Sequence, residues 1–492
     1  MTCKLSLSTL QDLPDSVARP RYDRADLSPG ILHIGVGNFH RAHQAVYLDR
    51  LFNKGRSLDW AIIGAGIMPA DAARREALKA QDWLTTVMDL SPDGIEARVT
   101  GAMIDFVEVD TAKLIEALAD PRIRIVTLTV TEGGYFIDET TGGFDAGHPD
   151  IRHDAADGGV PKTVFGAILG GLRLRRERTV APFTVLSCDN LPENGAITRR
   201  TVVGLARLMS QELADWVEAS VTFPNAMVDC ITPATTDRER MLAATRFGIE
   251  DRLPVACEPF RQWVIEDNFP TGRPELELVG VELVDDVTPY ETMKLRILNA
   301  GHAAIAYPSA LIGHELVHDA MADPCIRDWL MSLMLREVIP VLPRIEGVDF
   351  RAYLAKCVER FSNSEISDRI DRLCQDGSNR QPKFVLPTIA AAAAQGGKLE
   401  GLALEVAFWC RYCALNAPMA EGGRLDDPRA AMLHRAAVAA QDDPGRFLAL
   451  GEVFGKLSEN RRFAEAFAHQ LTKLGQVTPR EVLLDYLERK AA

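Results

Sequence analysis

A strand, a glycine turn and a helix follow one another at residues 31–51, and this order constrains the fold more than any other stretch. The apolar run ILHIGV occupies 31–36, the turn reads GVGNFHRAH, and apolar residues return at helical spacing from Ala42 to Leu51. Gly35 and Gly37 match the first two glycines of a dinucleotide-binding fingerprint, and His40 stands in place of the third. Gly35 would make the tight turn, and Gly37 would let the backbone approach a pyrophosphate at the helix N-terminus. A simple turn between strand and helix remains the alternative.

Four further apolar runs read as strands, and polar residues or glycines follow each of them. The runs are Trp60–Ile67, Ile123–Val130, Phe183–Leu186 and Thr222–Met227. The chemistry-bearing residues that follow them are Asp71, Thr131, Glu132, Gly133, Asn190 and Asp229. Ligands of open α/β sheets bind outside the carboxyl ends of the strands, so these residues are candidates for a binding site. The alternative for the loop asparagine is a turn.

Asp71 is the candidate for choosing between NAD and NADP. A carboxylate after the second strand binds the ribose hydroxyl of NAD and disfavours the phosphate of NADP. Asp71 lies farther from the glycines than the usual spacing of about 20 residues, and Arg74 and Arg75 follow it closely. We therefore expect NAD, with NADP as the second possibility, and a helix-capping role for Asp71 as the alternative.

The stretch Glu291–His302, ETMKLRILNAGH, places one lysine, one asparagine and one histidine in an apolar helical pattern. At about 100° per residue, Glu291 and His302 fall within about 80° of Lys294, and Asn299 falls near 140°. A lysine packed among Leu295, Ile297 and Leu298 would be partly desolvated, which lowers its pKa toward neutrality and suits it to act as a general base. A solvated lysine on an ordinary amphipathic helix is the alternative.

The pattern becomes helical from Lys294 almost to the end of the chain, whereas strands and helices alternate before it. With 492 residues the chain exceeds what one hydrophobic core usually supports. We therefore predict an α/β domain at 1–285 and an all-α domain at 286–492.

Composition narrows the class of partner. The 55 basic and 69 acidic residues give a net charge of −14, and no Lys/Arg-rich block is present, which argues against nucleic acid and anionic membranes. No apolar run reaches the length of a membrane span, and the N-terminus does not read as a secretory signal. The nine scattered cysteines fit a reducing compartment. We expect a cytoplasmic protein with small-molecule ligands, and with no exposed heptad seam we expect a monomer.

Six spaced motifs carry a family resemblance that covers nearly the whole chain. In order they are GVGNFHRAHQAVY, VTEGGY, SCDNLPENG, FPNAMVDCITP, DDVTPYETMKLRILNAGH and DGSNRQPKF. Together they resemble the mannitol dehydrogenase family of polyol-specific long-chain dehydrogenases. The resemblance implies a Rossmann-like N-terminal domain that binds a nicotinamide cofactor, an all-α C-terminal domain that carries a catalytic lysine, and chemistry without a metal.

The resemblance also implies roles for individual residues. Lys294 would take the alcohol proton, Asn190 and Asn299 would stabilise the alkoxide, and His302 would bind substrate hydroxyls. Substrate contacts would come from Asp229, Arg372 and Arg380, and Glu291 would relay protons from Lys294. Cofactor contacts would come from Gly35, Gly37, Asn38, Phe39, His40, Arg41, Asp71, Thr131, Glu132 and Gly133.

Oxidation of D-mannitol to D-fructose is the expected reaction within this family. D-Arabinitol oxidation and fructuronate reduction are the alternatives, because Arg372 and Arg380 could clamp a carboxylate. A remote alternative is a zinc hydrolase, since His314, Glu315 and His318 fit H-E-x-x-H with Glu337 as a possible third ligand. A protein that binds the cofactor without turnover is the other rival.

Overall fold

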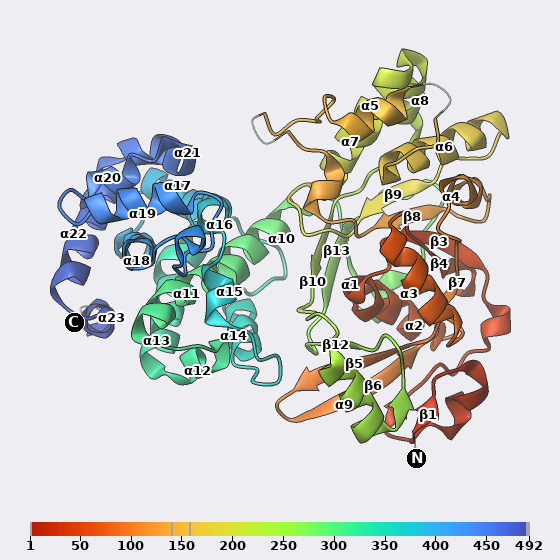
Figure 1. The fold of residues 1–492 in the computed structure, drawn as a ribbon, viewed down its shortest axis with the longest axis horizontal. Helices are drawn as coiled ribbons and strands as arrows, with labels where there is room; N and C mark the ends of the chain where they lie inside the picture. The colour runs from red at the N-terminus through yellow and green to blue at the C-terminus, as the bar shows by residue number, and fades with distance from the viewer. Residues whose placement is uncertain (1, 139–140, 157–158, 489–492) are drawn as a thin grey trace. The chain divides into compact units, whose positions relative to one another are not determined.

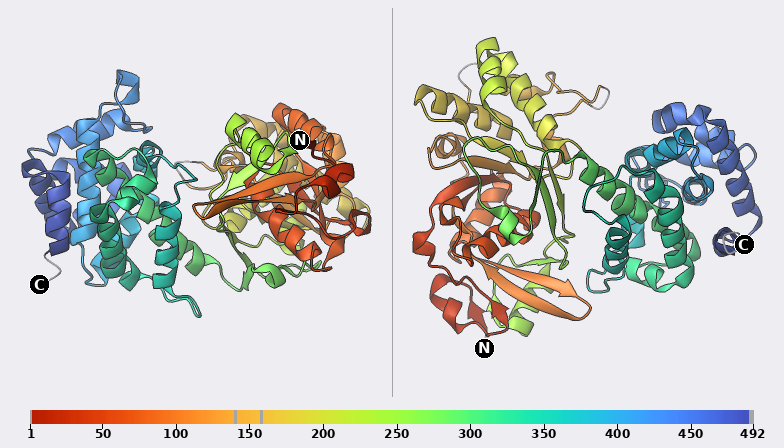
Figure 2. Two further views of the ribbon diagram at one scale, coloured as in Figure 1. Left: turned by 90° about the horizontal axis from the view of Figure 1, so that it is seen from below. Right: turned by 180° about the vertical axis from the view of Figure 1, so that it is seen from behind.

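The computed structural model describes residues 2–138, 141–156 and 159–488, and it divides the chain into two compact units, Met1–Thr288 and Pro289–Ala492 (Figure 1). The first unit is built on β-sheets with helices, and the second unit is helical (Figure 2). The predicted order, an α/β half followed by an all-α half, is therefore confirmed. Among the described residues, no helix is both long and apolar enough to cross a membrane.

The main sheet of the first unit has five parallel strands in the order β7-β4-β3-β8-β9. The strands are β3 (Pro29–Ile34), β4 (Ala61–Ala65), β7 (Met103–Phe106), β8 (Ile125–Leu128) and β9 (Thr184–Ser187). Taken in chain order the arrangement is 3-2-1-4-5, the order of doubly wound dinucleotide-binding sheets. The order reverses between β3 and β8, so the sheet edge after these two strands is the expected ligand position.

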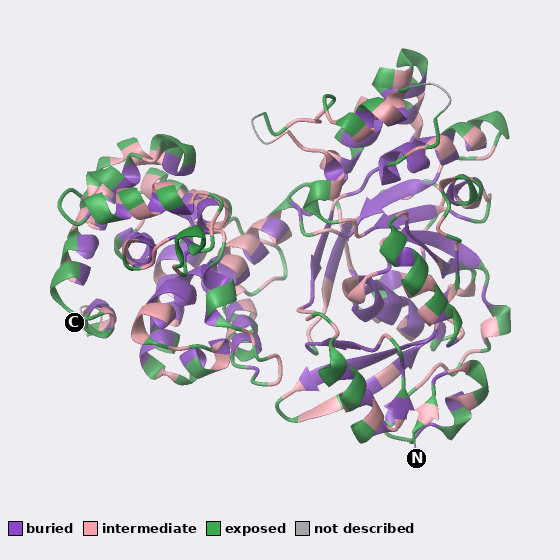
Figure 3. Cartoon of the chain, viewed as in Figure 1, coloured by how far each residue is buried: buried purple, intermediate pink, exposed green. Residues whose placement is uncertain are grey.

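Helices cover both faces of the sheet, so its strands are buried and carry apolar residues on both sides (Figure 3). Leu32, Ile34, Val126 and Leu128 pack in a core with α4, α6 and α7, whereas Ile31 and Ile125 pack in a second core with α2 and α3. Successive strand residues thus point to opposite faces. The helices of this unit are α1 (Asn38–Ala42), α2 (Gln44–Phe52), α3 (Pro69–Lys79), α4 (Thr111–Leu118), α5 (Pro149–Ala155), α6 (Val164–Glu177), α7 (Asn194–Met209), α8 (Gln211–Ser220) and α9 (Asp237–Phe247).

Three smaller sheets complete the first unit. One has the order β12-β5-β6-β2, one the order β10-β13-β14, and one pairs β1 with β11. Their strands are β1 (Cys3–Lys4), β2 (Val17–Ala18), β5 (Thr85–Ser91), β6 (Gly94–Thr100), β10 (Ala226–Asp229), β11 (Ile249–Glu250), β12 (Val255–Cys257), β13 (Gln262–Glu266) and β14 (Glu282–Val284). The strand predicted at Thr222–Met227 is wrong in position, since β10 begins only at Ala226. Pro224 lacks the N–H that a ladder at 222–225 would need.

The second unit is organised around α18 (Glu400–Leu415), which is buried over most of its length and packs against α11, α19 and α22. Cys410 and Cys413 lie buried on this helix as packing residues. The other helices are α10 (Thr288–Met293), the π-helix η6 (Lys294–Asn299), α11 (Ala300–Ile312), α12 (Val317–Ala322), α13 (Pro324–Leu333), the π-helix η7 (Met334–Val338), α14 (Phe350–Phe361), α15 (Ile370–Cys374), α16 (Gly377–Phe384), α17 (Leu386–Ala394), α19 (Ala430–Ala439), α20 (Gly445–Leu448), α21 (Gly451–Phe454), α22 (Arg461–Gln476) and α23 (Pro479–Glu488).

Candidate active site

The glycine turn and the end of β8 meet where the strand order reverses. Gly35 follows β3 with φ +97°, and a Cβ at this position would lie 2.1 Å from the carbonyl oxygen of Thr129. The Thr129 hydroxyl donates a hydrogen bond of 2.6 Å to the Gly35 carbonyl oxygen. Position 35 therefore requires glycine both for its backbone conformation and for this close approach.

Asn38 and Arg41 stabilise the glycine turn from within. Arg41 is buried and donates to the Gly37 carbonyl oxygen at 3.2 Å and to Asn38 Oδ1 at 2.7 Å. Asn38 Nδ2 in turn donates to the carbonyl oxygen of Pro233 at 3.1 Å. Burial lowers the pKa of Arg41 to about 10. The side chains of these two predicted cofactor residues are thus engaged in holding the turn.

His40 fills the space beneath the turn. Its ring stacks on the ring of His33, with centroids 3.5 Å apart and planes 9° apart, and both residues are buried. Burial lowers the pKa of His33 to about 3 and holds that of His40 well below its usual value, so both rings are neutral at pH 7. His33 bonds Thr127 Oγ1 at 2.8 Å, whereas neither ring nitrogen of His40 has a hydrogen-bond partner among the described residues. His40 therefore supports the turn by packing.

Asp71 lies in the first turn of α3, at the carboxyl end of the strand next to β3. Its Oδ2 accepts a hydrogen bond of 3.0 Å from the Met68 N–H, and its Oδ1 pairs with Arg74 at 2.5 Å. Asp71 thus caps α3, which is the alternative role predicted for it. It also lies where a ribose-binding carboxylate is found in dinucleotide-binding sheets. The long spacing from the glycines arises because two helices, α1 and α2, intervene before β4.

Asp189 organises the loop after β8, and it is not among the site residues predicted from the sequence. Its carboxylate accepts hydrogen bonds from the N–H groups of Val130 and Thr131 at 2.9 and 3.0 Å. Thr131 has φ +66° and leads into the short helix η4 (Glu132–Tyr135), which contains Glu132 and Gly133. The signal that could have found Asp189 is its position two residues after β9, next to Asn190.

Asn190 is exposed at the carboxyl end of β9, and Asn194 fastens this end of the sheet to β10. Asn194 is fully buried, donates to the carbonyl oxygens of Asp189 and Ala226, and accepts from the Ala226 N–H. β10 then ends at Asp229, which is 6 % exposed. The sheet edge therefore brings together Asp71, the glycine turn, Thr131 to Gly133 and Asn190, because β4, β3, β8 and β9 are neighbours.

The predicted regular α-helix at 291–302 is wrong at its centre. Lys294–Asn299 form a π-helix between α10 and α11. A π-helix bonds residue i to residue i+5, so Lys294 and Asn299 are separated by about one turn, whereas α-helical geometry would separate them by about 140°. Short π-helical segments within α-helices occur frequently at functional sites. The widened turn strengthens the prediction that these two residues act together.

Lys294 and Glu291 are both buried, at 6 % and 9 % exposure, next to the core residues Met293, Ile297 and Leu298. The Asn299 side-chain oxygen is buried and has no hydrogen-bond partner within the described part of the chain. A buried amide oxygen without a partner calls for an explanation, and contact with a ligand or a water molecule is one. His302 stacks on Phe361 with ring centroids 4.1 Å apart, which fixes its orientation.

The two predicted substrate arginines differ in their surroundings. Arg372 is exposed, and its guanidinium binds both carboxylate oxygens of Asp368, at 2.6 and 2.5 Å. Arg380 on α16 is half-buried and donates to the Leu373 carbonyl oxygen at 2.5 Å. Arg296 of the π-helix donates to the carbonyl oxygen of Lys383 at 2.8 Å, which ties the Lys294 segment to the helix of Arg380. Arg380 is therefore the better placed of the two to serve the same site as Lys294.

The zinc-hydrolase alternative fails on geometry. Gly313 ends α11 with φ +106°, so His314 and Glu315 lie outside any helix, while His318 lies on α12. The two histidines do not share a helix face, as the motif requires. The described residues contain no group of three or more His, Cys, Asp or Glu side chains that could hold a metal ion.

Glu337, the possible third ligand, has a structural role. It is buried and accepts hydrogen bonds from the N–H groups of Gly401 and Leu402 at the start of α18, at 2.8 to 3.0 Å, and from the Tyr486 hydroxyl. A carboxylate at this position satisfies N–H groups that have no partner within the helix.

Comparison with known proteins gives consistent matches over nearly the whole chain. Residues 29–278 match the model of the mannitol dehydrogenase Rossmann domain, and residues 286–475 match that of the mannitol dehydrogenase C-terminal domain. The chain is 54% identical to a mannitol 2-dehydrogenase of Cereibacter sphaeroides over 96% of this chain and 99% of that protein.

Two solved structures extend the comparison. The Pseudomonas fluorescens mannitol 2-dehydrogenase, in a ternary complex with NAD and D-mannitol, is 43% identical with a TM-score of 0.84, and the match covers 99% of this chain and all of that one. A substrate-free D-sorbitol dehydrogenase is 34% identical with a TM-score of 0.90, covering 97% of this chain and all of the other.

Proposed function

Because the chain belongs to the mannitol dehydrogenase family, we propose that it catalyses the NAD-dependent oxidation of D-mannitol to D-fructose with Lys294 as the general base. The observation that carries the proposal is the 43% identity, over 99% of this chain, to a solved enzyme that holds NAD and D-mannitol together. The buried Lys294, on one π-helix with Asn299, supports it from within the chain.

The sheet edge at the glycine turn fits a nicotinamide dinucleotide. Gly35 leaves room where any Cβ would meet Thr129, and the turn opens onto the N-terminus of α1. When bound, NAD supplies the acceptor for the hydride that leaves the alcohol carbon. Asp71 favours the ribose hydroxyl over a phosphate, because its charge would repel the phosphate of NADP. Arg74 pairs with Asp71 and could accommodate the 2′-phosphate of NADP, so NADP is the second candidate.

The chemistry that we assign to the chain is proton transfer and charge stabilisation at one oxygen. Lys294 takes the proton from the substrate hydroxyl, and general-base catalysis of this kind raises reaction rates by about two to four orders of magnitude. The side-chain amides of Asn299 and Asn190 donate to the developing alkoxide, which contributes about 3 kcal/mol per donor in comparable sites. Glu291 passes the proton from Lys294 to solvent, and His302, Asp229 and Arg380 bind the remaining hydroxyls.

A sugar-acid substrate is less well supported than a neutral polyol. A carboxylate clamp needs an arginine with free donors, and Arg372 already uses two of them on Asp368. D-Arabinitol remains the nearest neutral alternative, because it offers a secondary alcohol to the same base. We also propose that the protein is cytoplasmic, since its nine cysteines form no disulfide. We further propose that it is a monomer, and light scattering tests this oligomeric state.

The test is the change in nicotinamide absorbance with purified protein. D-Mannitol, D-arabinitol, D-sorbitol and xylitol are offered with NAD or NADP, and fructose, xylulose and fructuronate with the reduced coenzymes. We expect the highest kcat/KM for D-mannitol with NAD. A higher kcat/KM for fructuronate would indicate that the substrate is a sugar acid. Absence of turnover with every pair would contradict the proposal.

A further inference from the structure

A cationic cavity lies at the C-terminal end of α2, where β2, β6 and η5 (Leu276–Val279) meet. Its volume is about 500 Å³, and its lining comprises Ala18, Arg19, Asp49, Arg50, Asn53, Lys54, Arg98, Val99, Leu278 and Val279. Four of these side chains are basic and one is acidic. Such an excess of positive charge stands out on a chain whose net charge is −14.

Asp49, the acidic residue of the lining, is committed to the fold. Its Oδ1 accepts from the Tyr22 hydroxyl at 2.6 Å and from the Gly101 N–H at 3.0 Å, and its Oδ2 accepts from Asn53 Nδ2 at 3.0 Å. Burial raises the pKa of this carboxyl group, although its hydrogen bonds and the nearby Arg98 and Arg50 act in the opposite direction. The oxygens of Asp49 are thus occupied by neutral donors, and its single negative charge offsets only part of the positive charge of the lining.

Arg50 is a cation without a partner of its own. It is half-buried, and it makes no hydrogen bond or ion pair with any residue that the structure describes. Burial lowers the pKa of Arg50, and repulsion by Arg98 and Arg261 lowers it further, while Asp89 acts in the opposite direction. Asp89 is already shared, since it pairs with Arg98 at 3.1 Å and with Arg261 at 2.5 Å. Asp89 and Asp49 thus carry two negative charges beside the three guanidinium groups, and the cluster keeps a net positive charge.

This cavity is separate from the glycine turn. α2 begins just after that turn and runs for nine residues, so its C-terminal end lies about 13 Å farther along the helix axis. None of the residues predicted for cofactor or substrate binding lines the cavity. An anion bound here would occupy a second site.

We propose that this cavity binds a small phosphorylated metabolite, held by Arg50, Arg98 and Lys54. Guanidinium groups bind phosphate oxygens in pairs, and an ammonium group adds a point charge. The volume is in the range of about 300 to 1,000 Å³ typical of small-molecule sites. Binding here would stabilise the first unit by mass action, because the ligand offsets the repulsion around Arg50.

The test is calorimetric titration of the full-length protein with pyrophosphate and with glucose 6-phosphate, in the presence of saturating NAD and at constant ionic strength. Saturating NAD blocks phosphate binding at the glycine turn, and glucose is the uncharged control. We expect one site, no binding of glucose, and roughly tenfold weaker binding in Arg50→Gln, the effect of losing one charge-assisted hydrogen bond.

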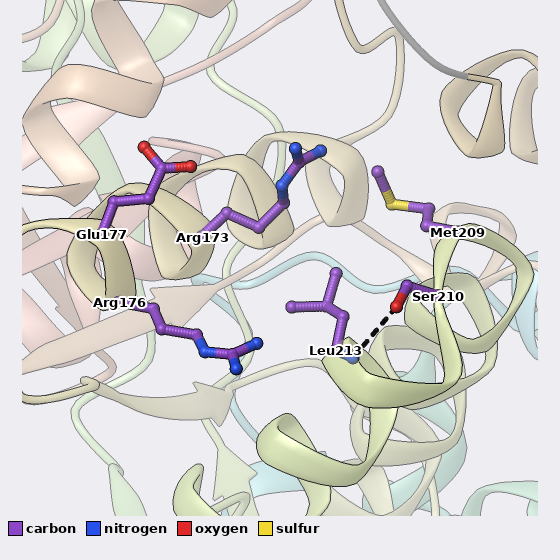
Figure 4. Close-up of a pocket in the computed structure, with 6 residues that line it drawn as sticks. All are labelled: Arg173, Arg176, Glu177, Met209, Ser210 and Leu213. Carbon is purple, nitrogen blue, oxygen red and sulfur yellow. Dashed lines mark hydrogen bonds between the residues drawn. The ribbon is translucent and has the colours of Figure 1, made fainter.

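The matched control is Arg173→Gln. Arg173 lines another cavity, of about 430 Å³, together with Arg176, Glu177, Met209, Ser210 and Leu213 (Figure 4). Arg176 there pairs with Glu212, and Glu177 also lines that cavity, so its two basic side chains are balanced by two acidic ones and the control should bind like the wild type.

Thermal unfolding without a probe separates binding from folding. Arg50→Gln should be as stable as the wild type or more stable, because the substitution relieves repulsion. If Arg50→Gln unfolds early, the exposed Lys54→Gln takes its place in the titration. Absence of binding to both probes, equal weakening in Arg173→Gln, or loss of binding on adding NAD would each overturn the proposal.

Discussion

The carboxylate of Asp189 accepts a hydrogen bond of 2.6 Å from the hydroxyl of Tyr135, and this contact joins the loops that follow β8 and β9. The Tyr135 hydroxyl also lies 2.6 Å from Ser187 Oγ, so the end of β9 and the loop at 130–135 form one hydrogen-bonded unit. Both Thr131 and Asn190, predicted as cofactor and catalytic residues, are attached to this unit. A single half-buried carboxylate thus positions two parts of the candidate site.

Asp189→Asn should loosen that unit. The amide keeps one acceptor oxygen but places an NH₂ group opposite donors, so we expect a loss of about 1 to 3 kcal/mol in the free energy of unfolding. We also expect a higher KM for NAD with a smaller change in kcat. Urea denaturation and steady-state kinetics measure the two effects. Tyr135→Phe and the double variant complete a double-mutant cycle, and additive losses would contradict the coupling.

Gly35→Ala should destabilise the first unit and impair cofactor binding. The new Cβ would approach the Thr129 carbonyl oxygen to 2.1 Å, on a residue with φ +97°. We expect a loss of at least about 2 kcal/mol, since the backbone conformation alone costs about 1 to 2 kcal/mol. Gly133→Ala is the control for stability, because a Cβ there meets no atom within 4 Å. Equal unfolding midpoints for wild type and Gly35→Ala would rule out the close approach.

Lys294→Ala should fold and lose turnover. Alanine is a good helix former, and the general base contributes about two to four orders of magnitude in rate, so kcat at neutral pH should fall by about that factor. NAD affinity, measured by fluorescence titration, should stay close to that of the wild type. The exposed Lys398→Ala serves as a control for the loss of one positive charge. Retention of wild-type kcat in Lys294→Ala would remove the proposed base.

Glu405 should make the second unit less stable as pH rises. Burial raises the pKa of its carboxyl group to about 8, while Gln381 donates to it at 2.7 Å. Between the unfolded pKa of about 4.3 and the folded value, the folded state binds one more proton than the unfolded state. Stability contributed by this group is therefore present below the unfolded pKa, falls by up to about 1.4 kcal/mol per pH unit within the window, and is constant above it.

Glu405→Gln should flatten this profile, because the amide does not titrate. The measurement is urea denaturation at pH 5.5, 6.5, 7.5 and 8.5. Glu400→Gln, an exposed position on the same helix, should keep the wild-type slope. Parallel slopes for wild type and Glu405→Gln would show that Glu405 does not carry the pH dependence.

Family and fold class were predictable from the sequence, and both predictions are confirmed. The signals are local. Runs such as ILHIGV form strands from their β-branched and apolar content, and a glycine at position 35 supplies a turn that other residues cannot adopt. Several strands of the smaller sheets escaped prediction because they are short and their partners are distant in sequence, as where β1 pairs with β11.

Candidate site residues were predictable where they lie at a strand end or within a motif. They were less predictable where packing between distant residues determines the position of the side chain. His40 was expected to contact the cofactor, yet its stacking on His33 depends on how a strand residue and a helix residue meet. His314 and His318 have the spacing of one helix face, but a left-handed Gly313 ends α11 before both of them, and only His318 lies in a helix. The assigned roles of Lys294, Asn190 and Asn299 stay predictions until the variants are measured.

The family could be identified from the six spaced motifs of the sequence. The order of an α/β half and a helical half and the glycine turn were also predictable, because short-range periodicity and backbone preference specify these features. The π-helix at Lys294–Asn299, the two loops that Asp189 joins, and the guanidinium groups around Arg50 became visible only in the folded chain. The last two bring together groups far apart in the sequence, which packing places side by side and sequence spacing does not reveal.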